Sequence, residues 1–133
     1  MSTPMRMAGL GPQIEALGHR IIGAAIEVHR TLGPGFLESV YEEAMAHELS
    51  LANIRYKRQI PIKVSYKGIQ VGNHRLDLLV EDTIIVELKA VDALGPVHKA
   101  QLISYLRATN LRLGYIFNFN APVLRNAMER IVL

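Results

Sequence analysis

The segment RLDLLVEDTIIVELK, residues 75–89, predicts two β-strands joined by a tight turn at Glu81-Asp82. Side-chain direction in a strand repeats every two residues, so Glu87 and Lys89 share one face about 6.5–7 Å apart. Asp77 lies on the preceding strand and joins them if the turn sets an antiparallel register. Burying charge without a partner is costly, so two acids and a lysine at one end of an apolar hairpin predict a binding site.

A surface salt bridge between the strands is the alternative explanation, and such a pair contributes under about 1 kcal/mol. The neighbouring residues argue against it, because they make both faces of the hairpin apolar. These neighbours are Leu76, Leu78, Leu79, Ile84, Ile85, Val86 and Leu88. A sheet that is covered on both faces leaves little room for idle charges, so we favour a functional site.

The chemistry that fits this site is a divalent cation with a reacting phosphate. Mg²⁺ prefers oxygen ligands and keeps several waters, so two carboxylates and one backbone carbonyl, that of Leu88, would suffice. A lysine beside them could activate an attacking water and stabilise charge that develops on phosphate.

The whole chain sets the outer limits of the interpretation. Its 133 residues, half hydrophobic and a fifth charged, predict one domain over residues 13–133 with a disordered N-terminus over residues 1–12. The absence of cysteine excludes disulfides and thiolate metal sites and favours a reducing compartment, so we expect a cytoplasmic protein. No apolar run is long enough to span a bilayer. A net charge of +3 permits nucleic acid as a partner without proving it.

Hydrophobic periodicity predicts the order helix, helix, three strands, helix, strand, helix, which is a compact α/β domain with a mixed sheet. The expected helices are Gln13–Leu32, Phe36–Ala52, Val97–Thr109 and a last one from about Asn120 to Glu129. The expected strands are Ile54–Tyr66, Ile69–Val80, Thr83–Lys89 and Leu113–Phe119. The last strand follows a crossover helix, so it should lie parallel to the third. In the second helix the expected buried stripe is Leu37, Val40, Ala44, His47 and Leu51.

Two further polar residues are open to two explanations each. Glu38 falls in the first turn of the second helix, where an acid is favoured by the helix dipole alone. Gln101 shares a stripe of the third helix with His98 and Tyr105, and this stripe is either a functional cluster or a polar seam between helix and sheet. The basic residues Arg55, Lys57, Arg58, Lys63 and Lys67 are explained by solubility unless the acidic site cleaves a phosphodiester.

Three sequence elements resemble a known family. The segment GFLESVY, residues 35–41, resembles the motif that names the GxxExxY protein family. Asp77, Glu87 and Lys89 resemble the metal-binding core of the PD-(D/E)XK nuclease superfamily, to which that family is assigned. The segment HKAQLISY, residues 98–105, is similar to the helix that follows. Leu76 stands where the superfamily name has proline, a tolerant position.

The resemblance implies a restriction-endonuclease-like fold, with a helix, a three-strand antiparallel meander, a helix and a parallel strand, to which this chain adds helices at both ends. It implies Mg²⁺ or Mn²⁺ as the cofactor. It also implies that Glu38, Asp77 and Glu87 surround the metal, that Lys89 positions or activates the water, and that Gln101 supports the site. Three residues would play further supporting roles: His98, Tyr105 and Tyr41.

The leading hypothesis is therefore an Mg²⁺-dependent nuclease that hydrolyses DNA or RNA through a metal-activated water. The first alternative is a non-catalytic module that keeps the fold and binds nucleic acid or protein. A small-molecule phosphohydrolase is the second, although no pocket motif supports it. Because the chain is small, a homodimer that completes the substrate surface is a further hypothesis.

Overall fold

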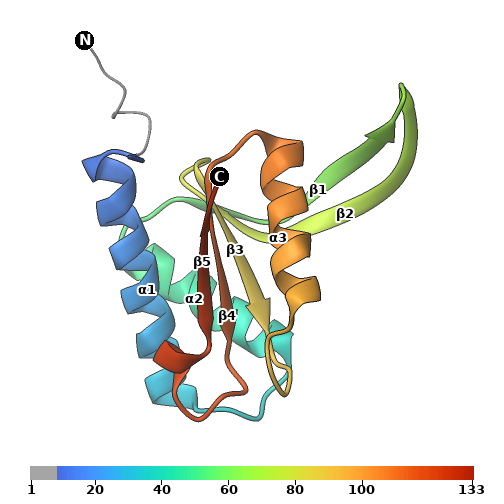
Figure 1. Cartoon of the computed structure of the whole chain (residues 1–133). Coiled ribbons are helices and arrows are strands. Elements are labelled where there is room, and N and C mark those ends of the chain that lie inside the picture. Colours follow the sequence, from blue (N-terminus) through green and yellow to red (C-terminus); the bar gives the residue numbers. More distant parts are fainter. Residues whose placement is uncertain (1–8) are drawn as a thin grey trace.

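The computed structural model describes residues 9–133, so most of the predicted disordered segment lies outside the described residues. Figure 1 shows the elements in their order along the chain. The helices are α1 (Pro12–Leu32), α2 (Glu38–Leu51) and α3 (Pro96–Thr109), with a 3-10 helix η2 (Leu124–Asn126). The strands are β1 (Tyr56–Tyr66), β2 (Ile69–Val80), β3 (Ile84–Lys89), β4 (Leu113–Asn118) and β5 (Met128–Val132). The mixed α/β architecture and the antiparallel meander agree with the sequence-based expectation.

The five strands form one sheet in the order β1-β2-β3-β4-β5, with helices on both faces (Figure 1). Strands β3 and β4 are parallel, as predicted for a crossover through α3, and the other neighbours are antiparallel. Residues of α1 and α2 pack with the sheet in the larger core, around Tyr41, Phe117 and Phe119. Residues of α3 pack on the opposite face in a smaller core, around Leu76 and Leu102.

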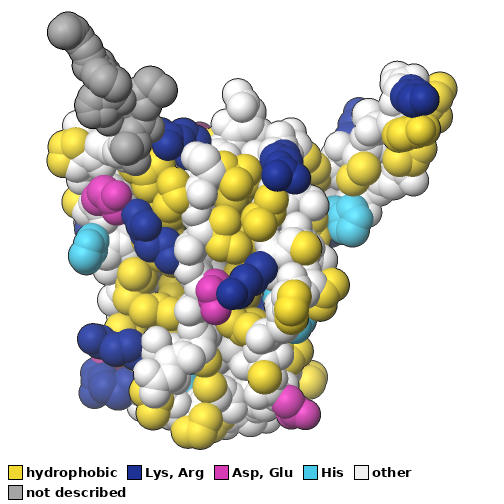
Figure 2. Space-filling view, in the orientation of Figure 1, with side chains coloured by type: hydrophobic (Ala, Val, Ile, Leu, Met, Phe, Trp, Pro, Cys, Tyr) yellow, Lys and Arg dark blue, Asp and Glu magenta, His cyan; other side chains and the backbone are white. Residues whose placement is uncertain are grey.

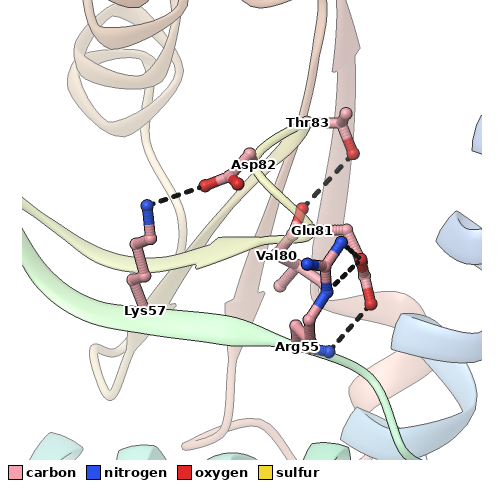
Figure 3. Close-up of polar contacts among 6 residues, drawn as sticks. All are labelled: Arg55, Lys57, Val80, Glu81, Asp82 and Thr83. Atoms are coloured by element: carbon pink, nitrogen blue, oxygen red, sulfur yellow. Dashed lines mark hydrogen bonds and ion pairs between the residues drawn. The ribbon is translucent and has the colours of Figure 1, made fainter.

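Polar contacts hold the turn between β2 and β3 (Figure 3). Arg55 binds Glu81 through its guanidinium and its backbone N–H, and Lys57 Nζ lies 3.1 Å from Asp82 Oδ1. The Thr83 hydroxyl donates to the carbonyl of Val80. The register that follows from this turn runs from Val80–Ile84 to Leu78–Val86, and its next step places Asp77 opposite Glu87.

The ribbon of β1 and β2 changes the layer that it faces at the level of Asp77. On β2, Leu78 packs in the larger core, whereas Leu76, two residues earlier, packs in the smaller one. On β1, Tyr56 packs against the larger core and Ile60 against the smaller. Between these two lies Gln59, whose φ of 53° is left-handed. An even spacing normally keeps side chains on one face, so this backbone twist explains the exchange.

Two sequence-based expectations about the helices are wrong. The predicted last helix, Asn120 to Glu129, is a 3-10 turn followed by β5, which pairs antiparallel with β4 and covers its free edge. Alternating half-buried and exposed residues in β5 fit this edge position. In α2 the predicted stripe faces outward, with Leu37 77% and Leu51 65% exposed. The buried residues of this helix are Tyr41, Met45, Ala46 and Leu49.

Candidate active site

Strands β2 and β3 are joined by side chains rather than by a regular ladder where Asp77 meets Glu87. The backbone N–H of Leu88 donates to Asp77 Oδ2 at 2.8 Å, and the N–H of Asp77 donates to Glu87 Oε2 at 3.0 Å. Each carboxylate therefore holds the opposite strand through one oxygen. The register therefore brings the two acids side by side, as the sequence predicted.

Burial of this pair makes the charged forms costly. Glu87 is only 4% exposed, and burial together with the nearby Asp77 raises its pKa to about 8. Burial also raises the pKa of Asp77, although the N–H of Leu88 acts in the opposite direction. Lys89 lowers both pKa values, whereas Glu38 raises both. A site that concentrates negative charge under low solvation attracts a cation.

Helix α3 supplies the other side of the site. Lys89 Nζ donates to Gln101 Oε1 at 3.2 Å, which places the predicted lysine and glutamine in direct contact. Tyr105 is buried, and Glu87 and Asp77 both contribute to raising the pKa of its phenol. Its hydroxyl lies 3.2 Å from Nδ1 of His74. Gln101 and Tyr105 therefore belong to one cluster with the acids.

Glu38 comes to the site from α2, where it is the first helical residue. Its Oε2 accepts the N–H of Ala90, directly after Lys89, at 3.3 Å. Tyr41 fixes this end of the helix: its hydroxyl donates to the carbonyl of Gly33 at 2.6 Å and accepts the N–H of Phe36. Gly35, with φ of 108°, makes the bend between them. The glycine, glutamate and tyrosine of segment 35–41 thus form one structural unit that positions the glutamate.

His98 has a structural task at the beginning of α3. Its Nδ1 accepts the N–H of Gly95 at 2.9 Å, so the side chain caps the helix.

Leu88, predicted to offer its carbonyl, has its N–H directed at Asp77, while the carbonyl of Lys89 accepts the N–H of Phe119 on the β4 side. Since N–H and C=O of one strand residue point to the same side, the Leu88 carbonyl faces the Asp77 side.

Three residues that were not predicted from the sequence lie beside the acids: Glu42, Arg58 and Gln59. Glu42, one helical turn after Glu38, raises the pKa of Asp77 and accepts hydrogen bonds from Arg58 and from Gln59, the latter at 2.6 Å. The sequence-based explanations for Arg58 were solubility or neutralisation of phosphates, and neither includes this contact with Glu42. The four-residue spacing of Glu38 and Glu42 was a usable signal, because it puts both on one helix face. Nothing in the sequence marks Gln59.

The oxygen atoms of Asp77 and Glu87 fit a divalent cation. Asp77 Oδ1 and Glu87 Oε1 have no hydrogen bond within residues 9–133, and no described buried side-chain oxygen lacks a partner, so solvent reaches both atoms. Two free carboxylate oxygens suit Mg²⁺, which uses one or two carboxylates and completes its shell with water. Within the same residues, no group of three or more acids and histidines forms a metal-binding cluster. The pair fits the ion, and a third carboxylate ligand from Glu38 stays a prediction.

Together, a sheet flanked by helices and a site of two acids and a lysine where two strands part define a domain of restriction-endonuclease-like fold. The family model described as the PD-(D/E)XK nuclease superfamily matches residues 15–131, and the chain belongs to this superfamily. A comparison with curated proteins gave no match. The superfamily is one of nucleases, so the family assignment implies nuclease function and a nucleic-acid substrate. In the described part of the chain, no helix has the length and apolar character needed to cross a membrane.

Proposed function

We propose that this protein is an Mg²⁺- or Mn²⁺-dependent nuclease of the GxxExxY type, with Asp77 and Glu87 as the residues that hold the cation. The observation that carries the proposal is the pair of accessible, unpaired carboxylate oxygens beside the contact of Lys89 with Gln101. The side of the strand toward which the Leu88 carbonyl points supports its role as an additional ligand. Glu38 supports the same site from α2.

The roles of the chain's own groups follow from their contacts. When bound, the cation would supply Lewis-acid activation of water and charge neutralisation at the phosphate. Lys89, oriented by Gln101, presents a positive charge to the phosphate on the α3 side of the site. A cation bound between buried Glu87 and half-buried Asp77 would be stabilised because it relieves the repulsion between the two carboxylates. Tyr105 on α3 contacts His74 on β2 beside the acids.

The test is cleavage of labelled DNA and RNA in the presence of Mg²⁺, Mn²⁺ or EDTA. Lys89→Ala and Asp77→Asn should each lose about 100-fold or more in rate. The first removes the positive charge that stabilises the reacting phosphate, and the second removes a carboxylate that holds the cation. Lys99→Ala and Asp82→Asn are matched controls, since they remove the same groups from surface ion pairs with Glu129 and Lys57. Thermal melting checks that all four variants fold.

Two outcomes would contradict the proposal. Cleavage that survives in both site variants removes these residues from the chemistry. Salt-sensitive binding of nucleic acid by the wild type, without metal-dependent products, would favour the non-catalytic binding module instead.

A further inference from the structure

The hairpin of β1 and β2 extends beyond the body of the protein as a two-stranded arm (Figure 1). We define the arm as residues 63–73, the part beyond the buried Ile62. Within it every residue is exposed except the half-buried Gly72. Neither helix layer covers the arm, so its side chains are free to meet a partner.

The arm is nevertheless an ordered ribbon. Its register pairs Lys63 with Asn73 and Tyr66 with Ile69. At the tip Lys67 and Gly68 have φ values of 50° and 84°, as a type I′ turn requires, so the turn matches the twist of the strands. A two-stranded ribbon without a covering layer has only marginal stability in water. Contact with a partner surface would stabilise the arm.

The arm carries cations and apolar groups and no acid. No aspartate or glutamate occurs between Arg55 and Leu76. Closer to the body, Lys57 and Arg58 form ion pairs, whereas in the described structure Lys63 and Lys67 have no carboxylate partner. The exposed apolar side chains of the arm are Val64, Tyr66, Ile69 and Val71, which are 36%, 61%, 65% and 59% exposed. On the face seen in Figure 2 the arm likewise shows hydrophobic and basic side chains.

We propose that the arm is a nucleic-acid-binding ribbon that contacts the substrate at some distance from the cleavage site. This proposal rests on the proposed nuclease function. The strand β2 connects the two regions directly. Asn73, opposite Lys63, is four residues from Asp77, or roughly 13 Å, and the tip is about ten residues away, at most about 33 Å. Successive phosphates of one strand lie about 3.4 Å apart along a duplex, so the distance from Asp77 to the tip corresponds to at most about one helical turn.

The surface chemistry favours this occupant over a second copy of the chain. A second arm would offer basic and apolar side chains and no acid, so it would give Lys63 and Lys67 no carboxylate partner. A polyanion instead neutralises Lys63 and Lys67. Tyr66 and Ile69 form a cross-strand apolar pair at the tip, and such groups contact bases by stacking or by wedging between them.

The experiment measures binding apart from cleavage. The full chain with Asp77→Asn is titrated in EDTA against a fluorescent 20-base-pair duplex and a single strand of one sequence, over a series of salt concentrations. Adding Lys63→Ala and Lys67→Ala should lower affinity at least tenfold at low salt and reduce the slope of log K against log salt by about two. Tyr66→Ala should weaken binding and leave that slope unchanged, because it removes no charge.

The matched control is the pair Arg20→Ala and Arg125→Ala, two exposed cations on α1 and η2, and thermal melting checks its fold because Arg20 donates to the carbonyl of Ala52. Arg75 is left in place because its guanidinium donates to the carbonyl of Gln59 beside the site. The control should bind like the parent. Equal affinity and slope in the arm variant and the parent would overturn the proposal, as would a changed elution volume of the arm variant with unchanged affinity, which would make the arm a contact between copies. Arm-dependent binding by a wild type that cleaves nothing would overturn the nuclease function and leave the arm's role intact.

Discussion

Asp77 and Glu87 hold each other's strands: the N–H of Asp77 binds the carboxylate of Glu87, and the carboxylate of Asp77 binds the N–H of Leu88. These side-chain hydrogen bonds take the place of the backbone hydrogen bonds that would otherwise pair the two strands here. It also leaves one oxygen on each acid for another ligand. The same two residues thus set the local backbone and create the concentrated charge of the site.

Metal-free protein should lose stability as the pH rises. The pKa of Glu87 is about 8 in the folded chain and near the ordinary 4.5 when unfolded, so the folded state binds more protons in this range. The contribution of Glu87 to stability is therefore fully present below the unfolded pKa and is lost as the pH rises through about 8, and the raised pKa of Asp77 acts in the same direction. The melting temperature in EDTA should drop between pH 5 and pH 8.5, and Glu87→Gln should remove most of that drop.

Added Mg²⁺ should raise the melting temperature more at pH 8.5 than at pH 5, because the ion binds the deprotonated carboxylates.

Glu81→Gln is the control for the pH dependence in EDTA, since the pKa of that turn residue is lowered by Arg55. It should leave the slope between pH 5 and pH 8.5 as in the wild type. A wild-type melting temperature that does not vary with pH would contradict the assignment.

Removing the hydroxyl of Tyr41 should affect both stability and activity. Tyr41→Phe keeps the ring stacked on Phe119, with centroids 4.5 Å apart, but loses the contacts with Gly33 and Phe36. The expected cost is about 1–2 kcal/mol in the free energy of unfolding. Cleavage should fall further than the change in stability explains, because Glu38 follows the released loop.

Tyr56→Phe is the comparison for this variant. It also removes a tyrosine hydroxyl, but one that contacts Ser50 at an exposed position. Denaturant titration and cleavage rates should show little change. Equal effects of the two substitutions on cleavage would show that Tyr41 has no special part in placing Glu38.

The backbone of Gln59 predicts an unusual order of stabilities. Gln59→Gly and Gln59→Ala both lose the amide contact with Glu42, so their difference reports the backbone alone. At a φ of 53° the glycine variant should be more stable than the alanine variant by about 1 kcal/mol. The same pair of substitutions at Lys57, an ordinary strand position, should give the opposite order. Denaturant unfolding measures both differences, and the same order at both positions would contradict the strain.

The strands and the central site could be predicted from the sequence because their evidence is local. Alternation fixes Glu87 and Lys89 on one face, and a short turn brings Asp77 opposite them. The prediction of the buried face of α2 was wrong because the helix has two sets of residues at helical spacing. Tyr41, Met45 and Leu49 recur at four-residue steps as regularly as the stripe that we expected to be buried, and only packing on Phe119 decides between them.

The C-terminal strand and Gln59 depend on the folded neighbourhood in a different way. Segment 120–129 has a proline and polar residues that fit a helix start, but the open edge of β4 offers a strand partner. The backbone N–H of Asn118 binds the carbonyl of Ala127, which folds the chain back onto that edge. Local propensity yields to such tertiary pairing, and a left-handed glutamine inside a strand has no local signal at all.

Packing of α1 on β4 predicts a coupling between Gly18 and Tyr115. A Cβ atom at Gly18 would lie 2.4 Å from the hydroxyl oxygen of Tyr115 and 3.3 Å from Cζ, so Gly18→Ala should cost about 1–3 kcal/mol. In the double variant Gly18→Ala/Tyr115→Phe the closest clash is gone, and most of this cost should be recovered relative to Tyr115→Phe alone. Gly23→Ala, in the same helix with no atom within 4 Å, should instead stabilise the protein by about 0.5–1 kcal/mol. Denaturant unfolding of the four variants measures the coupling, and additive effects of the Gly18 and Tyr115 substitutions would show that the helix shifts to make room.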